Sequence, residues 1–462
     1  MRNHTNVIAT LIGSIAVPFL MHCDAASPAS TPAEVGPDAA VASTCAEQSG
    51  PGTSHGGDAV TTDTVWTAAA GPHHVTFGFT VEAAAKLTIE PCARVVFDGG
   101  YGVTVKGKLV AEGTASSPIT FEAGDATKPW SGLLVALGSP GTISLANATL
   151  SDGGNTDDPN ITGMIDARGD GDGAPTERLK VVDVTIKGSR QYGVVLRNGA
   201  TFTSDSSNLV VSGAKLFPVR ADARLTTHIP SGVYTGNAND ELLLDLSRDV
   251  SNDTTLRERG VPYRLGGTEG VNAGSNMAVG ISGPTAQAAT VTIEAGVKLR
   301  ASAASSIQLR KDAAQKAVGK LVVKGTASAP VVFTSAAATP KAGDWRGIVF
   351  DAPDATNAID HAVIEYAGGP SQANSFHCDP QSTTGGFSSN EDAAVALFGQ
   401  PASAFVTNTT ITKSAGDGIG RSWSGGLVDF LATNTFDQIS ACKQSYPRAA
   451  SGACPVGSVP CA

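Results

Sequence analysis

The stretch KLVAEGTASSPITF at residues 108–121 returns as KLVVKGTASAPVVF at residues 320–333. Each copy holds two short runs of alternating apolar residues, a pattern typical of strands with one buried face. Gly, Thr, Ala, Ser and Pro stand between the runs and indicate a tight turn. A unit of strand, turn and strand is therefore present twice in this chain.

The repetition extends to both sides of this phrase with its order kept. The corresponding segments are 63–66 and 253–256, 87–92 and 291–296, 130–135 and 345–350, 148–154 and 362–369, and 185–189 and 410–414. The distance between the copies grows along the chain because polar insertions such as 310–318 lengthen the second copy. We infer two tandem copies of a module of about 200 residues that was lengthened in its loops.

A shorter rhythm runs through the first copy. Phe97, Phe121 and Leu145 follow one another at intervals of about 24 residues, as do Leu109 and Leu133. This interval predicts that each turn of short parallel strands lies on the turn before it, with like residues stacked. The interior of such a coil is narrow, which fits a chain that is only 5% aromatic.

This order of motifs resembles the secreted bacterial right-handed parallel β-helix proteins of the pectin-lyase-like superfamily. The residues that carry the resemblance are 87–92, 109–121 and 130–133, and again 291–296, 321–333 and 345–348. It covers roughly residues 60–440 and implies an all-β fold, a right-handed parallel β-helix (solenoid). No activity is implied, because that superfamily includes lyases, hydrolases, adhesins and proteins with no known chemistry.

The N-terminus predicts export. Arg2 and the apolar run Val7–Met21 indicate a signal peptide over residues 1–25, because a membrane-spanning helix needs about 20 apolar residues. Cys23 is the lipidation candidate of a lipoprotein, although His22 stands where a small residue is usual, and ordinary cleavage after Ala25 or Ala26 is the alternative.

The remaining chain divides by composition. Residues 26–58 are rich in Ala, Pro, Ser, Thr and Gly and predict a flexible spacer. Residues 59–235 and 236–440 are the two predicted β-helix modules, and residues 441–462 form a Cys-rich tail.

Six cysteines outside the signal peptide predict three disulfides in an exported chain. The disulfide candidates are Cys45, Cys92, Cys378, Cys442, Cys454 and Cys461. Cys92 stands where the second copy has Gly296, and a turn glycine usually supplies a positive φ. We hypothesise that a disulfide from Cys92 to Cys45 compensates for this replacement.

The formal net charge of −10 disfavours nucleic acids and anionic membrane surfaces as partners. The chain has neither a phosphate-binding G-x-x-x-x-G-K-[ST] motif nor a serine elbow beside plausible partners, so we expect no cofactor.

The richest acidic stretch, residues 151–173, is interpreted as a solvated loop. Its NTDD at 155–158 is similar to a fragment of the polygalacturonase active-site pattern, but the rest of that pattern is absent. Calcium binding by Asp166, Asp170 and Asp172 is the alternative, although their spacing differs from an EF-hand. We assign no other metal site and no catalytic residue.

Three further pairs of residues allow two interpretations each. His73 and His74 align with residues 261–264, which suggests a strand edge in both copies, and we favour a surface turn over metal ligands. For Cys378 beside His377 we favour a structural cysteine over a nucleophile or metal ligand. For Trp130 and Trp345 we favour packing at a corner of the coil over sugar-stacking platforms.

Two classes of function remain. The first is a non-catalytic exported component of the outer membrane, the cell surface or the extracellular space, structural or binding a surface glycan or another envelope protein. The alternative is a polysaccharide-active enzyme, either a pectate-lyase-like lyase or a glycoside hydrolase. We favour the first class because the duplication kept the coil-building residues, whereas the charged clusters do not recur between the copies.

Overall fold

The computed structural model describes residues 43–154, 162–171, 174–267, 274–372, 376–379, 382–388, 390–454 and 456. The predicted signal peptide with Cys23, residues 26–42 of the predicted spacer, Asp172 and Cys461 lie outside the described residues.

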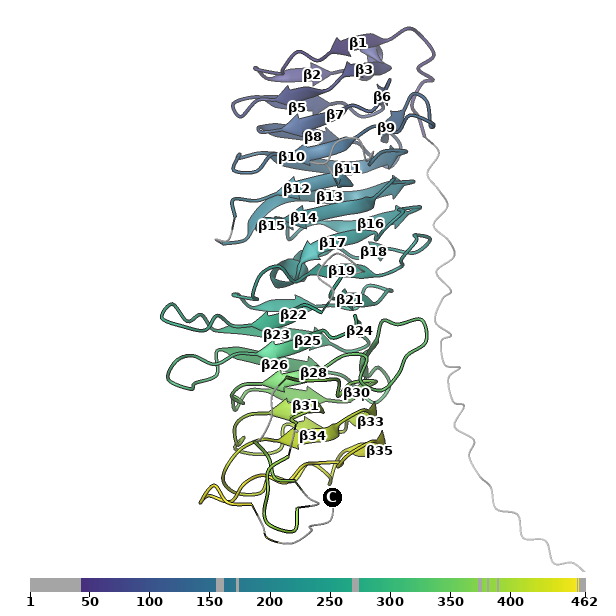
Figure 1. Cartoon of the computed structure of the whole chain (residues 1–462). Helices are drawn as coiled ribbons and strands as arrows, with labels where there is room; N and C mark the ends of the chain where they lie inside the picture. Colours follow the sequence, from purple (N-terminus) through teal and green to yellow (C-terminus); the bar gives the residue numbers. More distant parts are fainter. Residues whose placement is uncertain are drawn as a thin grey trace, which may run out of the picture. The chain divides into compact units, whose positions relative to one another are not determined.

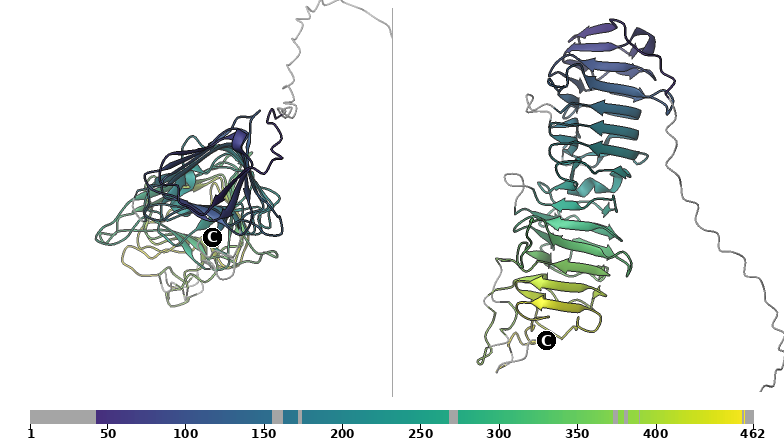
Figure 2. Two further views of the ribbon diagram at one scale, coloured as in Figure 1. Left: turned by 90° about the horizontal axis from the view of Figure 1, so that it is seen from above. Right: turned by 90° about the vertical axis from the view of Figure 1, so that its right-hand side faces the viewer.

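The unit that begins at Ser43 is a parallel β-helix, as predicted. Its strands stack in parallel rung upon rung, and the coil has a triangular outline when it is seen along its axis (Figures 1 and 2). Since one rung cannot bury its own apolar face, each rung depends on its neighbours for a continuous core.

The strands of the described residues form four sheets. A 12-stranded sheet contains β1 (Thr53–Gly56), β2 (Thr64–Trp66), β3 (His73–Phe77), β5 (Lys86–Ile89), β6 (Arg94–Phe97), β8 (Lys108–Glu112), β9 (Ile119–Ala123), β11 (Thr142–Ser151), β13 (Thr176–Lys187), β15 (Ala200–Phe202), β16 (Ser207–Ser212) and β18 (Gly232–Val233).

A 13-stranded sheet runs from the first part of the coil into the second. Its members are β4 (Phe79–Val81), β7 (Gly102–Val105), β10 (Gly132–Val135), β12 (Gly163–Arg168), β14 (Tyr192–Arg197), β17 (Val219–Asp222), β19 (Leu242–Asp245), β21 (Tyr263–Leu265), β24 (Lys298–Ala301), β27 (Val331–Ser335), β30 (Ala362–Glu365), β33 (Thr410–Ser414) and β35 (Thr435–Ile439).

Two five-stranded sheets complete the second part. One contains β20 (Thr254–Leu256), β23 (Ala289–Glu294), β26 (Gly319–Lys324), β29 (Ala358–Asp360) and β32 (Val406–Thr407), and the other contains β22 (Asn276–Val279), β25 (Ser306–Leu309), β28 (Gly347–Phe350), β31 (Ala393–Leu397) and β34 (Asp417–Arg421). The only helices of the described chain are the 3-10 turns η1 (Ala68–Ala70) and η2 (Ala223–His228).

The core is a column of stacked aliphatic side chains. Leu87, Leu109, Ile143 and Leu179 lie opposite one another on successive rungs, and all four are buried. Alternate residues of the same strands face outward, which is why the apolar pattern of these segments has a period of two.

The stacking register differs from the one expected from the 24-residue rhythm. Val95, and not Phe97, lies opposite Phe121, and Leu133 lies in a different sheet from Leu109. The corners between strands differ in length, so the rungs contain different numbers of residues. Counting residues therefore predicts that rungs stack, but it assigns the wrong partner to individual residues.

The repeated phrase folds into the same local structure in both places. In each copy a strand pair, β8–β9 or β26–β27, flanks a turn whose Thr exchanges backbone hydrogen bonds with the residue three positions on: Thr114 with Ser117, and Thr326 with Ala329. The sheets differ, however, because β9 belongs to the 12-stranded sheet and β27 to the 13-stranded sheet. The second copy of the phrase therefore lies on another face of the coil.

A disulfide closes the N-terminal end. Cys45 is bonded to Cys92, which is the pairing hypothesised from the sequence. Cys92 has a φ of 68°, and Gly296 at the equivalent position has a φ of 80°. The backbone at this turn is thus left-handed in both copies, and Cys92 accepts a conformation that favours glycine.

Ion pairs link the rungs on the outer face of the 13-stranded sheet. Glu241 is buried and pairs with Arg264 on β21 and with Arg300 on β24. One carboxylate therefore bridges two neighbouring strands.

Candidate functional site

The outer face of the sheet β22–β25–β28–β31–β34 carries small and polar side chains. One row of this face consists of Ala278, Gln308, Val349, Ala396 and Gly420, which lie opposite one another from strand to strand. The residues between them, such as Ile307 and Ile348, point into the core. This alternation leaves a shallow floor on which polar groups can face a ligand.

A cavity of about 480 Å³ lies over this floor. Its lining combines the floor with residues from the connections beside it: Asn276, Ser306, Gln308, Lys311, Gln315, Arg346, Val349, Asp351, Ser371, Phe376 and Phe398. We call this cavity the groove. It is large enough for a small ligand or a short stretch of a polymer.

Two cations and one carboxylate set the charge of the groove. Lys311 comes from the polar insertion 310–318, and Arg346 and Asp351 stand directly before and after β28. The Nε atom of Arg346 is buried and has no hydrogen-bond partner within the described part of the chain. Burial raises the pKa of Asp351 above its ordinary value, although the hydrogen bond from Gln308 and the charges of Lys311 and Arg310 oppose this shift.

Two aromatic rings stand at the side of the groove. Phe376 and Phe398 meet edge to face, with ring centroids 5.9 Å apart. Amide groups from Asn276, Gln308 and Gln315 stand in the same cavity. Flat apolar rings together with amide and hydroxyl groups suit the faces and the hydroxyl groups of a sugar.

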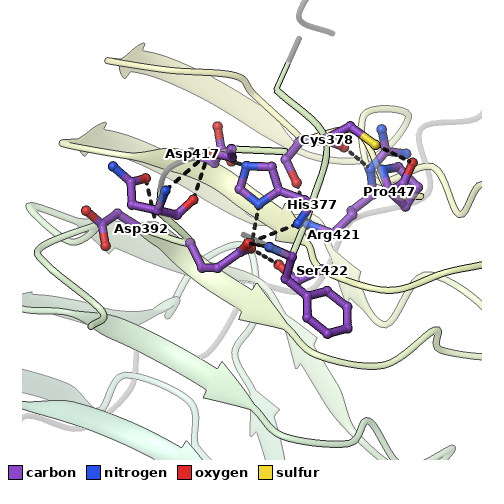
Figure 3. A network of polar contacts seen from close by, with 12 residues as sticks. His377, Cys378, Asp392, Asp417, Arg421, Ser422 and Pro447 are labelled. Carbon is purple, nitrogen blue, oxygen red and sulfur yellow. Dashed lines mark hydrogen bonds and ion pairs between the residues drawn. The ribbon is translucent and has the colours of Figure 1, made fainter. Parts of the chain in front are cut away.

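A buried polar cluster holds the segment that contains Phe376 (Figure 3). Nδ1 of His377 lies 2.5 Å from Oε2 of Glu391, and Nε2 lies 3.5 Å from Oδ2 of Asp417. The backbone N–H groups of Phe376 and His377 donate to Oε1 of Glu391 at 2.5 and 2.9 Å. The hydroxyl of Ser422 donates to the same carboxylate.

The charges of this cluster are coupled. Burial raises the pKa of Asp417 to about 6, although the charge of His377 opposes the shift. Burial alone would lower the pKa of His377, but the hydrogen bond and charge of Glu391 and the charge of Asp417 raise it. Burial would likewise raise the pKa of Glu391, yet its contacts with His377 and Ser422 lower it.

His377 and Asp417 of this cluster also line a second cavity of about 440 Å³. It is lined by His377, Asp379, Ser388, Asn390, Asp392, Ala415, Gly416, Asp417, Ser440, Ala441 and Cys442. The segment 376–379 therefore stands between the groove and an acidic cavity.

The structure places several of the residues singled out from the sequence in structural roles. Trp130 and Trp345 are fully buried, and their indole N–H groups donate to the carbonyls of Ser151 and Glu365 at 2.8 and 2.9 Å. They are packing residues, as favoured. Cys378 forms a disulfide with Cys454, and Cys442 is also disulfide-bonded.

The expected surface turn at His73 is wrong. His73 is a buried residue of β3, and its ring stacks with those of Trp66 and His55 at the N-terminal end of the coil. Burial lowers the pKa of His55 to about 4, and the charge of His73 adds to this effect. The strand agrees with the strand-edge position that the alignment with residues 261–264 suggests, whereas the burial of His73 follows from packing at the end of the coil, which a two-residue motif could not indicate.

The two calcium candidates that the structure describes, Asp166 and Asp170, lie apart from the groove, on and after β12. Asp166 is buried and pairs with Arg168 and Arg197, and Asp170 pairs with Arg178. Among the described residues no group of three or more His, Cys, Asp or Glu side chains could hold a metal ion. The same residues contain no helix that is long and apolar enough to cross a membrane.

The sequence does not predict the groove, although it does show the polar insertion that forms one wall of it. The sequence shows the insertion 310–318 as a polar lengthening of the second copy of the repeat, and this insertion contributes Lys311 and Gln315. The remaining lining comes from three strands and from several separate connections, which only the stacking of rungs brings together.

Comparison with known proteins supports the fold. Residues 272–435 match the family model described as a pectate-lyase-like β-helix domain. This segment includes β22, β25, β28 and β31 and all the residues that line the groove. Comparisons with curated proteins and with solved structures find no match.

Proposed function

We propose that this protein is a non-catalytic, exported component of the cell envelope that binds an acidic glycan in the groove. The observation that carries the proposal is that two cations, Lys311 and Arg346, line one cavity. The same cavity also holds amide groups and two phenylalanine rings. Arg346 supports an anionic ligand most directly, because its Nε is buried without a partner in the described chain.

The location and organisation of the protein belong to the same proposal. Disulfides such as Cys45–Cys92 and Cys378–Cys454 fit an oxidising compartment, and the apolar N-terminal run fits a signal peptide with lipidation at Cys23. The identical turns at Thr114 and Thr326 support the duplication of one module. In this proposal a tethered β-helix presents its groove to a glycan or to another envelope protein that bears one.

The test is binding of the purified protein to polygalacturonate and alginate, with neutral dextran as reference, by isothermal titration calorimetry at low and high salt. Arg346→Gln and Lys311→Gln should each weaken binding by about tenfold, since a hydrogen bond to a charged group contributes roughly 1.5–3 kcal/mol. Lys108→Gln, an exposed cation on β8, is the matched control and should bind like the unaltered protein. Absence of binding, or equal binding by all variants, would overturn the proposal.

Polysaccharide cleavage is the second candidate function. It is favoured by the match to a pectate-lyase-like domain and by Asp351, a carboxyl with a raised pKa beside two cations in the groove. An assay for reducing ends and unsaturated products on the same polysaccharides, with and without calcium, separates the two candidates. Turnover that Asp351→Asn abolishes would replace binding by catalysis as the function.

A further inference from the structure

The segment 376–379 contributes to both cavities. Phe376 lines the groove, whereas His377 and Asp379 line the acidic cavity. Because Phe376 and His377 are consecutive, the contacts that hold His377 also restrict the position of Phe376.

Most of the contacts that hold this segment are polar and buried. Glu391 accepts from the backbone N–H groups of Phe376 and His377 and from the imidazole, while Asp417 faces the opposite ring nitrogen. His377, Glu391 and Asp417 are each less than 5% exposed. We call these three residues the clasp.

The clasp holds one more carboxylate than it has cations. One imidazolium balances one carboxylate, so the second buried carboxylate is compensated only by more distant charges. Asp379 adds a negative charge near His377 from its own segment, and Arg421 of β34 adds a positive charge near Asp417. The N–H of Cys442 donates to Oδ1 of Asp417 at 2.9 Å.

Two other links limit how far the segment can move. Cys378 is tied to Cys454 by a disulfide, and the guanidinium of Arg448 donates to the carbonyl of Phe376 and lies 4.7 Å from its ring. Loss of the clasp would therefore release the segment locally without detaching it.

We propose that the clasp is a pH-sensitive device that holds Phe376 in the wall of the groove under mildly acidic conditions and releases it as the pH rises. The inference rests on the proposed function, because the groove is the site that it would regulate.

The direction of this pH dependence follows from the pKa shifts of the three residues of the clasp. The folded-state pKa of Asp417 is raised to about 6, so its contribution to closure is complete below its ordinary value of 3.8 and is lost as the pH rises through 6. The pKa of His377 is also raised, so its contribution is complete below 6.5 and is lost as the pH rises through its folded value. The pKa of Glu391 is lowered, so its contribution is present above 4.5 and is lost only on acidification. The clasp should be firmest near about pH 5.

Hydrogen exchange read by mass spectrometry tests the clasp without any ligand. After correction for the chemical exchange rate, protection of the Phe376 and His377 amides should fall by at least about tenfold between pH 5 and pH 8. Asp417→Asn keeps the side-chain volume and should reduce this dependence to the part that His377 contributes, and His377→Gln should give low protection at both pH values. Asp98→Asn, which alters the exposed pair His74–Asp98, is the matched control. A fall of equal size in the unaltered protein and in Asp417→Asn would overturn the proposal.

Binding of polygalacturonate at the same two pH values tests the coupling to the groove. The ratio of affinities at pH 5 and pH 8 should be larger in the unaltered protein than in Asp417→Asn, and titration of Asp351 cancels because both proteins contain it. Equal ratios would overturn the regulatory role. Absence of binding at both pH values would overturn the proposed function together with that role, while the exchange comparison would still decide whether the clasp responds to pH.

Discussion

The left-handed turn at Cys92 allows a sharp test of why this position differs between the two copies. In a Cys45→Ser background, which removes the disulfide, Cys92→Gly and Cys92→Ser leave the same open chain and differ only at the turn. A left-handed conformation costs a residue with a Cβ about 1–2 kcal/mol, and glycine gives back roughly 0.5–1 kcal/mol through its greater freedom in the unfolded chain. We therefore expect Cys92→Gly to be more stable by about 1 kcal/mol.

The disulfide itself should contribute more than the turn costs. The two cysteines are 47 residues apart, and closing a loop of this length stabilises the folded state by about 4 kcal/mol in the chain-entropy model. Both open-chain variants should thus be less stable than the unaltered protein, by about 3 kcal/mol with Gly and 4 kcal/mol with Ser.

The assay is denaturant unfolding followed by the fluorescence of the four tryptophans, of which Trp66 lies on β2 in the first rungs. Gly296→Ser is the matched control in the second copy, where an added Cβ would meet only Glu258 and Ala329 at ordinary contact distances. It should cost about 1 kcal/mol. If Cys92→Ser were as stable as Cys92→Gly, the argument from the backbone conformation would be refuted.

Three further predictions concern the core, the outer face and the N-terminal end. Trp130→Phe and Trp345→Phe should each destabilise the protein by about 2 kcal/mol in denaturant unfolding, because in each variant a partly buried carbonyl loses its indole donor. Glu241→Gln should cost about 3 kcal/mol, since one buried carboxylate bridges two arginines, and thermal unfolding will measure it. Protonation of His55 opposes folding, so its stabilising contribution is present above pH 6.5 and is lost as the pH falls through about 4. Acid titration should therefore change the tryptophan fluorescence, to which Trp66 contributes, and His55→Phe should reduce this change to the part that His73 contributes, because burial lowers the pKa of His73 as well.

Each of these predictions has an outcome that would contradict it. Unequal costs for the two tryptophan variants would argue against equivalent corners. Glu82→Gln alters the exposed pair with Lys106 and should have little effect, so an equal loss from Glu82→Gln and Glu241→Gln would remove the role of burial. A pH response of His55→Phe like that of the unaltered protein would assign the titration to another group.

Much of the coil can be predicted from local pattern. The two copies around Thr114 and Thr326 carry their strands and their turn in the residues themselves, and the structure shows the same hydrogen bonds in both. The buried tryptophans and the cysteine at a glycine position could also be interpreted from one sequence, because comparing the copies shows which positions are equivalent. These inferences depend on neighbours in the chain or on a second example of the same environment.

The groove and the clasp could not be predicted in this way. Lys311, Arg346 and Phe376 come from different connections, and His377 meets Glu391 and Asp417 only because β31 and β34 are neighbours in one sheet. Rung length varies along the coil, so counting residues even misplaced the partner of Phe121. If the length of a corner is predicted wrongly by a few residues, the set of apolar residues stays the same. The side chains that are predicted to meet across rungs, however, change.

The sequence alone therefore determined that this chain forms stacked parallel strands, because the alternation of buried and exposed residues and the turn chemistry act over a few residues. Only the tertiary structure decided where polar side chains converge, which sheet receives each copy of the repeat, and that His377 lies between two carboxylates. Those features depend on register between rungs, and register is set by the lengths of all the intervening corners together.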